Sequence, residues 1–383
     1  MEARNERDRM MDRSSMGSIL NGFVAAIAVV TPALASNPGA AIYFPPIIPA
    51  NPTPLIISGD GTTAIGVNGV PNRGFQWKLG HGITVLPRLP ATDTTNSVSA
   101  INTDGSVIAG YSRIGTSRIG TRWIDVDTVH AIDDLPGGDV RLDPNGVSGD
   151  GNIVVGIDRN SLTSHQAFVW TKATGTFGLG YLSSSHNFSS ADAISADGST
   201  VVGVSAGSFS TRAFKWTEAD GMVSLGVDAE RATGVNSDGS AIVGSMGGGD
   251  AFLWTSDQGI QELSHPWDSP SSVVFVSDVS DNGVIVGNGR QNGSSPNVAV
   301  LWSEDRGSRL FADMLAEDYG FAMEDFTYSR LTSVSDDGRV FAGVGHFGSE
   351  PDQGFVVIIP SPTPVFVAMC SLGAVCARRR RAN

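Results

Sequence analysis

The chain has 383 residues, of which 40% are hydrophobic and 17% are charged, and its formal net charge is −14. This composition is typical of a globular protein and excludes a disordered one, and the acidic balance argues against nucleic acid, whose phosphates it would repel. Both cysteines, Cys370 and Cys376, lie near the C-terminus, so the body has no disulfide, cysteine nucleophile or cysteine metal site.

Residues 1–35 predict a signal peptide, and with it an N-terminal signal helix. Met16–Val30 is an apolar stretch that is short for a spanning helix, and Ala33 and Ala35 form an A-x-A pattern that places cleavage before Ser36. The charges that precede the apolar stretch cancel one another. An uncleaved anchor or a buried apolar segment is the alternative.

The stretch Ala193–Trp216, AISADGSTVVGVSAGSFSTRAFKW, shows the unit on which the body is built. Asp197-Gly198 lies between two short β-prone runs, which predicts a tight hairpin turn. Gly203 closes the second run, where a side chain would obstruct a bulge or a close backbone approach. Phe214 and Trp216 are two residues apart, so a strand places both on one face. The unit is predicted to be a four-stranded antiparallel sheet that needs neighbouring sheets to cover it.

Similar units begin near residues 55, 100, 147, 193, 233, 278 and 333. Successive turn glycines are 44, 46, 47, 41, 44 and 55 residues apart, a period that is typical of propeller blades. We therefore predict an all-β fold, a seven-bladed β-propeller over residues 40–359. The blade-turn residues are Asp60, Asp104, Asp150, Asp197, Asp238 and Asp337, with Asp281 in the sixth unit. The blade-core residues are Trp77, Trp123, Trp170, Trp216, Trp254 and Trp302.

The two ends of the body predict how the ring closes. The seventh unit ends at its third strand, Phe355–Ile359, and Ala41–Phe44 could supply the fourth. Joining the chain ends in one blade removes exposed sheet edges, whereas the alternative, an open stack of sheets, leaves two. The long last spacing contains Leu310–Tyr319, whose apolar pattern predicts a short helix between blades six and seven.

Residues 360–383 form a separate tail. Proline recurs at Pro360, Pro362 and Pro364, which predicts a stiff linker, and Val365–Ala377 is a short apolar run that predicts a C-terminal hydrophobic helix. Four arginines follow at once: Arg378, Arg379, Arg380 and Arg381. An apolar helix with a terminal arginine cluster anchors a chain during export and leaves the arginines in the cytoplasm.

Two resemblances follow from these patterns. The alternation of A-[IV]-[SN]-x-D-G-x-x-[VI]-x-G with A-F-x-W resembles the HAF family of bacterial extracellular repeat proteins over most of Leu55–Ile359. The tail is similar to the PEP-CTERM sorting signal, with a proline-rich motif, a short apolar helix and an arginine cluster. The resemblance implies processing by an exosortase-type enzyme and a destination at the cell surface or in the extracellular matrix.

The sequence contains only weak matches to catalytic and ligand-binding motifs. Gly203–Gly207 matches G-x-S-x-G and Gly343–Gly348 matches G-x-G-x-x-G, but neither has the strand–turn–helix context that these motifs need. The six histidines lack metal-ligand spacing. The turn aspartates are interpreted as turn chemistry, with Ca²⁺ binding as the alternative. We expect no cofactor.

The sequence therefore favours a non-enzymatic structural or interaction module, exported to the cell surface or matrix and transiently anchored in the inner membrane by its tail. Its expected partners are envelope or matrix components, protein or polysaccharide. The alternative is an extracellular propeller enzyme, a hydrolase or lyase acting on glycans. Asp133-Asp134 and Glu324-Asp325 are the candidate carboxylates for that alternative.

Overall fold

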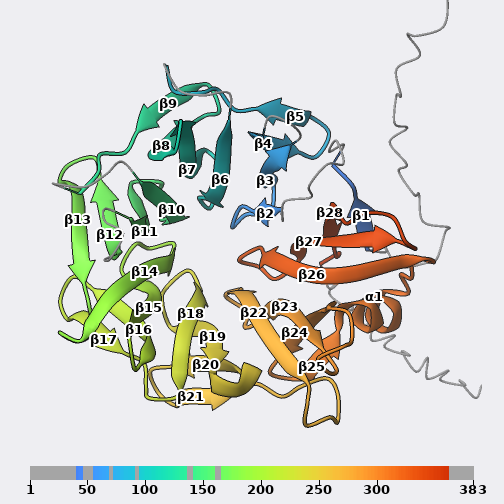
Figure 1. Cartoon of the computed structure of the whole chain (residues 1–383). Coiled ribbons are helices and arrows are strands. Elements are labelled where there is room, and N and C mark those ends of the chain that lie inside the picture. Colours follow the sequence, from blue (N-terminus) through green and yellow to red (C-terminus); the bar gives the residue numbers. More distant parts are fainter. Residues whose placement is uncertain are drawn as a thin grey trace, which may run out of the picture.

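The computed structural model describes residues 40–45, 55–68, 72–90, 95–135, 141–159 and 165–361. It consists of seven four-stranded antiparallel sheets arranged around one axis (Figure 1). The prediction of a seven-bladed propeller with four-stranded blades is confirmed. The predicted signal helix, the cleavage residues Ala33, Ala35 and Ser36, and the tail from Pro362 onward lie outside the described residues.

The blades follow one another in chain order. Blades 1 and 2 consist of β2 (Ile56–Ile57), β3 (Thr63–Asn68), β4 (Arg73–Lys78) and β5 (Gly82–Val85), then β6 (Asn96–Ile101), β7 (Val107–Ile114), β8 (Ser117–Ile124) and β9 (Thr128–Ala131). Blades 3 and 4 consist of β10 (Leu142–Val147), β11 (Ile153–Asp158), β12 (Gln166–Thr171) and β13 (Gly175–Gly180), then β14 (His186–Ile194), β15 (Val201–Gly207), β16 (Thr211–Thr217) and β17 (Gly221–Ser224).

Blades 5 and 6 consist of β18 (Ala229–Val235), β19 (Ala241–Met246), β20 (Ala251–Thr255) and β21 (Gly259–Glu262), then β22 (Val273–Val279), β23 (Ile285–Arg290), β24 (Val298–Ser303) and β25 (Gly307–Leu310). Blade 7 consists of β26 (Phe326–Val334), β27 (Val340–Phe347), β28 (Gln353–Ile358) and β1 (Ala41–Tyr43). A 3-10 turn, Gly247–Gly249, precedes β20.

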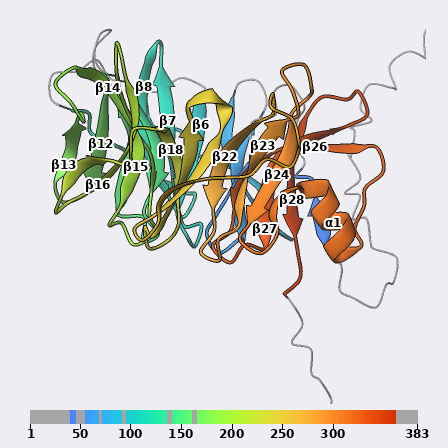
Figure 2. The same cartoon turned by 90° about the horizontal axis from the view of Figure 1, so that it is seen from below.

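The ring closes in blade 7. Strand β1 pairs with β28 in antiparallel register, with Ala41 opposite Ile358 and Ile42 opposite Val357. The N-terminal strand therefore supplies the missing fourth strand, as predicted. The predicted helix is also present: α1 (Phe311–Tyr319) lies at the edge of the ring, where Phe311, Met314 and Leu315 pack into the core cluster that it shares with blade 7 (Figure 2).

The repeated aromatic pairs fill the space between blades. Phe214 is fully buried, and Phe214 and Trp216 of blade 4 pack against Val155 and Val169 of blade 3. The tryptophans of blades 1 to 3 are at most 8% exposed, and those of blades 4 to 6 are partly buried. Blade 2 has Thr121 in place of the phenylalanine, yet Trp123 is fully buried beside Ile65 and Leu86 of blade 1.

Each inner strand from blade 2 to blade 7 contains a β-bulge. Three positions before the turn Ser or Asn, the register skips one residue in each of these strands, and the skipped residues are Ser99, Asn145, Asp192, Thr233, Ser277 and Thr332. The inner strands of blades 4, 5 and 7 contain a second register shift nearer their start. In these blades a Cβ on the motif glycine of the second strand would lie only 2.0 to 2.3 Å from a carbonyl oxygen of the inner strand. The close approach predicted at Gly203 is confirmed, and the bulge turns six polar residues toward the axis.

Candidate functional site

The two faces of the ring differ because the strands alternate in direction. We call the turn face the side that carries the hairpins between the first and second strands, which contain the Asp-Gly turns. We call the mouth face the opposite side, which carries the loops between second and third strands and the connections between blades. A central channel of about 240 Å³ runs between them and is lined by residues of all seven inner strands.

A wider pocket lies where this channel meets the mouth face, and we call it the mouth pocket. Its volume is about 430 Å³, which is within the range of small-ligand sites. Six of its eight lining residues are polar or charged, and Phe275, which is 40% exposed, is its aromatic member. The lining residues are Ser99, Asn145, Asp192, Arg231, Thr233, Ser245, Phe275 and Val276.

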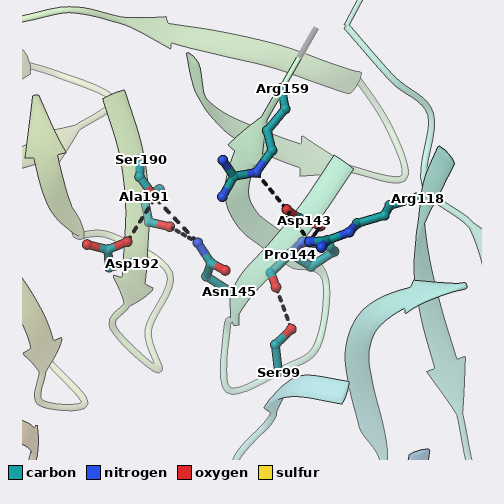
Figure 3. A network of polar contacts seen from close by, with 9 residues as sticks. All are labelled: Ser99, Arg118, Asp143, Pro144, Asn145, Arg159, Ser190, Ala191 and Asp192. Atoms are coloured by element: carbon teal, nitrogen blue, oxygen red, sulfur yellow. Dashed lines mark hydrogen bonds and ion pairs between the residues drawn. The ribbon is translucent and has the colours of Figure 1, made fainter. Parts of the chain in front are cut away.

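Three of the bulge residues at this level connect one blade to the next. Ser99 Oγ donates to the carbonyl oxygen of Pro144, and Asn145 Nδ2 donates to that of Ala191 at 2.9 Å (Figure 3). Thr233 Oγ1 donates in the same way to the carbonyl oxygen of Val276 at 3.0 Å. Since these bonds cross blade boundaries, they fix the shape of the pocket as well as the packing of the ring.

Two carboxylates at the mouth are paired with arginines. Asp143, whose side chain is 10% exposed, accepts hydrogen bonds from Arg118 Nη1 of blade 2 at 3.0 Å and from Arg159 Nε at 2.8 Å (Figure 3). Asp192 is held in a bidentate pair by Arg231 of blade 5, at 2.7 and 3.0 Å. Burial raises the pKa of Asp192, and the Arg231 guanidinium opposes that rise.

Deeper in the channel, the wall also carries Asp278 and Asp336. Burial raises the pKa of Asp278 to about 6, although the carboxylate accepts backbone hydrogen bonds from Val334 and Val279. Burial and the nearby Asp281 charge raise the pKa of Asp336. No group of three histidine, cysteine or acidic side chains placed to hold a metal ion occurs among the described residues.

The predicted blade-turn aspartates lie on the turn face, away from the mouth pocket. In blade 4, Asp197 Oδ1 accepts hydrogen bonds from the Ser195 hydroxyl at 2.5 Å and from the Ser199 amide at 2.9 Å. Hydrogen bonds from neighbouring serines lower the pKa of other members of this set, namely Asp104, Asp150 and Asp238. Their oxygens therefore serve the turns, and the same placement holds for Asp60 and Asp337.

The sixth turn differs from the prediction. Asn282, not Asp281, occupies the equivalent position and accepts the Ser280 hydroxyl at 2.6 Å. Asp281 instead accepts the backbone amide of Ser237 in blade 5 at 2.9 Å. Hydrogen bonds of this kind join every pair of adjacent turns: Asp60 N–Thr103 O, Asn102 Nδ2–Gly149 O, Gly149 N–Ala196 O, Asp197 N–Ser237 O, Ser237 N–Asp281 Oδ1, Asp281 N–Asp336 O and Asp336 N–Gly59 O.

The serine of the G-x-S-x-G match and the two candidate acidic pairs lie outside the mouth pocket. Ser205 of the G-x-S-x-G match is fully buried within strand β15, without an elbow, and its Oγ lies 2.8 Å from His186 Nδ1. Glu324 and Asp325 are exposed beyond α1. Asp133 is exposed as well, whereas Asp134 turns inward to the buried Asp158, whose pKa is raised to about 7 by burial and by Asp134. Asp133 and Asp134 therefore face different surroundings.

The residues of the mouth were missed by the sequence analysis. Asp143 meets Arg118 across 25 positions of the chain, and Arg231 meets Asp192 across 39. One signal was present in the repeats: the residue three positions before the turn Ser or Asn is polar in six of the seven units. Ser99, Asn145 and Asp192 could have been found from it.

Comparison with known proteins supports the fold only. No family model matches the sequence, and no curated protein does either. An oligogalacturonate lyase in complex with manganese is 13% identical, with a TM-score of 0.51 over 80% of this chain and 88% of that one. TolB from Acinetobacter baumannii is 15% identical, with a TM-score of 0.44 over 66% of this chain. The alignment spans 64% of that TolB chain.

No helix among the described residues is both long and apolar enough to span a bilayer. The predicted C-terminal hydrophobic helix and Arg378–Arg381 lie outside those residues, and of the tail motif only Pro360 and Ser361 are described. Strand β28 runs toward the turn face, where Arg339 Nη1 donates to Ser361 Oγ at 2.6 Å. The chain therefore leaves the ring on the face opposite the mouth pocket.

Proposed function

We propose that the chain is an exported, non-enzymatic interaction module, displayed at the cell surface or in the extracellular matrix, that binds a polar ligand in the mouth pocket. The mouth pocket carries this proposal. It combines about 430 Å³ of space with guanidinium, amide, hydroxyl and carboxylate groups and one exposed phenyl ring, Phe275. Pockets with a few fixed polar groups on a rigid scaffold are typical binding sites.

The pairing of the mouth carboxylates supports binding over hydrolysis. A glycosidase needs one carboxylic acid and one free carboxylate on opposite sides of the bond that breaks. At the mouth, Asp143 is shared by two arginines and Asp192 is held bidentately by Arg231. Both carboxylates therefore accept strong hydrogen bonds from the protein itself, so neither is a free carboxylate of the kind that hydrolysis needs.

The two chain ends support export. The signal-peptide pattern before Ser36 predicts export, and the tail with Arg378–Arg381 is similar to the PEP-CTERM sorting signal. Since the chain leaves the ring on the turn face, an anchored tail would hold the mouth face outward. Protein recovered from the envelope should begin at Ser36, and retention of residues 1–35 would contradict export by this signal.

Blocking the pocket tests the binding role. Purified full-length chain is passed over immobilised matrix polysaccharides and envelope proteins, with and without Ca²⁺. Ser245→Trp would fill the pocket, so its binding should fall at least about tenfold. Val223→Trp adds the same side chain to an exposed position of the outer strand β17 and should bind as the wild type does. Equal binding by the two variants, or turnover of a glycan, would contradict the proposal.

A further inference from the structure

Four arginines lie side by side on the mouth face of blades 2 and 3, and we call them the arginine row: Arg113, Arg118, Arg141 and Arg159. Arg113 and Arg118 are directly opposite one another in the β7–β8 ladder. Arg118 forms a parallel bridge with Arg141, and the Arg159 amide donates to the Arg141 carbonyl oxygen at 3.0 Å. Four positions that lie up to 46 residues apart in the chain thus become consecutive neighbours.

The row concentrates positive charge on an acidic protein. Among the described residues, Asp143 is the carboxylate that pairs with the row, and it contacts only Arg118 and Arg159. Arg113 and Arg141 are exposed, and the side chains of Arg118 and Arg159 remain 38% exposed despite their ion pairs. Like charges directly opposite each other in a sheet are destabilising, so the placement of Arg113 opposite Arg118 costs stability.

The spacing of the row favours an extended ligand. Neighbouring strands are about 4.8 Å apart, so the path through the four backbone positions is roughly 15 Å long. A guanidinium group binds a carboxylate through two parallel hydrogen bonds, and its exposed N–H groups are ready to do so. A linear polysaccharide with a carboxylate on successive sugars presents negative charges at a comparable step. A single small anion would engage only part of the row.

We propose that the arginine row binds an acidic, carboxylate-bearing polysaccharide, which lies along the row beside the mouth pocket. This inference rests on the proposed function, because it names the ligand class of that face. Arg118 and Asp143 link the row to the pocket, since the Asp143 strand continues into Pro144 and Asn145 at the pocket wall (Figure 3). The net charge of −14 confines binding of any long polyanion to the row. Guanidinium groups also bind phosphates, so nucleic acid is the competing ligand that the test includes.

The test compares the full chain with a double variant, Arg113→Gln with Arg141→Gln, which leaves the Asp143 ion pairs intact. The probes are polygalacturonate, the neutral polymer dextran, and single-stranded DNA of matched charge. The wild type should bind polygalacturonate, release it as salt is raised, and ignore dextran. The double variant should bind about fivefold to tenfold more weakly.

Arg212→Gln is the matched control, because Arg212 is on the mouth side of blade 4 but outside the row, and its binding should equal that of the wild type. Unchanged melting of the double variant excludes misfolding as the cause of any loss. Equal binding by wild type and double variant, or equal binding of DNA and polygalacturonate, would overturn the inference. If binding depends on the mouth pocket but not on Arg113 and Arg141, the inference about the arginine row is wrong, and the proposed function still holds.

Discussion

Gly203→Ala would test how closely the bulged inner strand approaches its neighbour. An ideal Cβ on Gly203 would lie 2.0 Å from the carbonyl oxygen of Ser190, and the obstructing atom belongs to the backbone of the inner strand. That strand is held by its own hydrogen-bond ladder and by contacts with the next blade, so moving it away from a new Cβ would cost free energy. Overpacking lowers the free energy of unfolding by about 1–3 kcal/mol. Because the clash here is with backbone, we expect a loss at the upper end of that range, about 3 kcal/mol.

Gly66→Ala is the matched comparison. Gly66 has the same place in blade 1, where the described part of the inner strand, Ile56–Ile57, contains no bulge, and its nearest obstructing atoms are side-chain atoms of Leu55 and Phe75 at 2.9 Å. These side chains can shift by a few tenths of an ångström, so we expect a cost of about 1 kcal/mol. Denaturant unfolding followed by tryptophan fluorescence measures both variants. A Gly203→Ala variant as stable as Gly66→Ala would refute the bulge argument.

Three further changes probe the ion pairs, the buried acids and the closure of the ring. Asp143→Asn removes the charged partner of two arginines and should lower the free energy of unfolding by about 1–2 kcal/mol, and an unchanged urea midpoint would count against the pairing. The Asp158 pKa of about 7 lies above its unfolded value of 3.8, so the folded chain holds a proton that the unfolded chain has released. The stability that this group contributes therefore falls as the pH rises between those values. Asp158→Asn should melt at a higher temperature than the wild type at pH 8 but not at pH 4. Equal melting of the two proteins at both pH values would contradict the pairing of Asp158 with Asp134. Ile42→Pro should disrupt pairing of β1 with β28, so fast hydrogen exchange is expected in Gln353–Ile358, and full protection there would contradict closure by β1.

The fold was predictable because its signals are local and repeated. Asp197-Gly198 and the Phe214–Trp216 pair each lie within one unit, and seven units that carry versions of these features at a regular spacing identify the blades. The closing strand Ala41–Tyr43 followed from counting strands in the last unit. The helix Phe311–Tyr319 followed from its apolar spacing.

The mouth was not predictable in the same way because its contacts join different blades. Nothing near Asp143 in the sequence indicates that Arg118 will lie 3.0 Å away, since that distance depends on the twist and order of the sheets. The arginine row is similar, because Arg141 lies beside Arg118 only through a bridge between two blades. The exchange of Asp281 and Asn282 in the sixth turn was missed for a different reason: the two residues are adjacent and have similar turn chemistry.

The most direct test of a binding role for the mouth face follows ligand and product together. The full chain is incubated with polygalacturonate, and retention of the polymer is measured alongside new chain ends and unsaturated products. We predict salt-sensitive retention that depends on Arg113 and Arg141, with the length of the polymer unchanged. Shortening of the polymer by the wild-type chain would contradict the account and identify the protein as an enzyme.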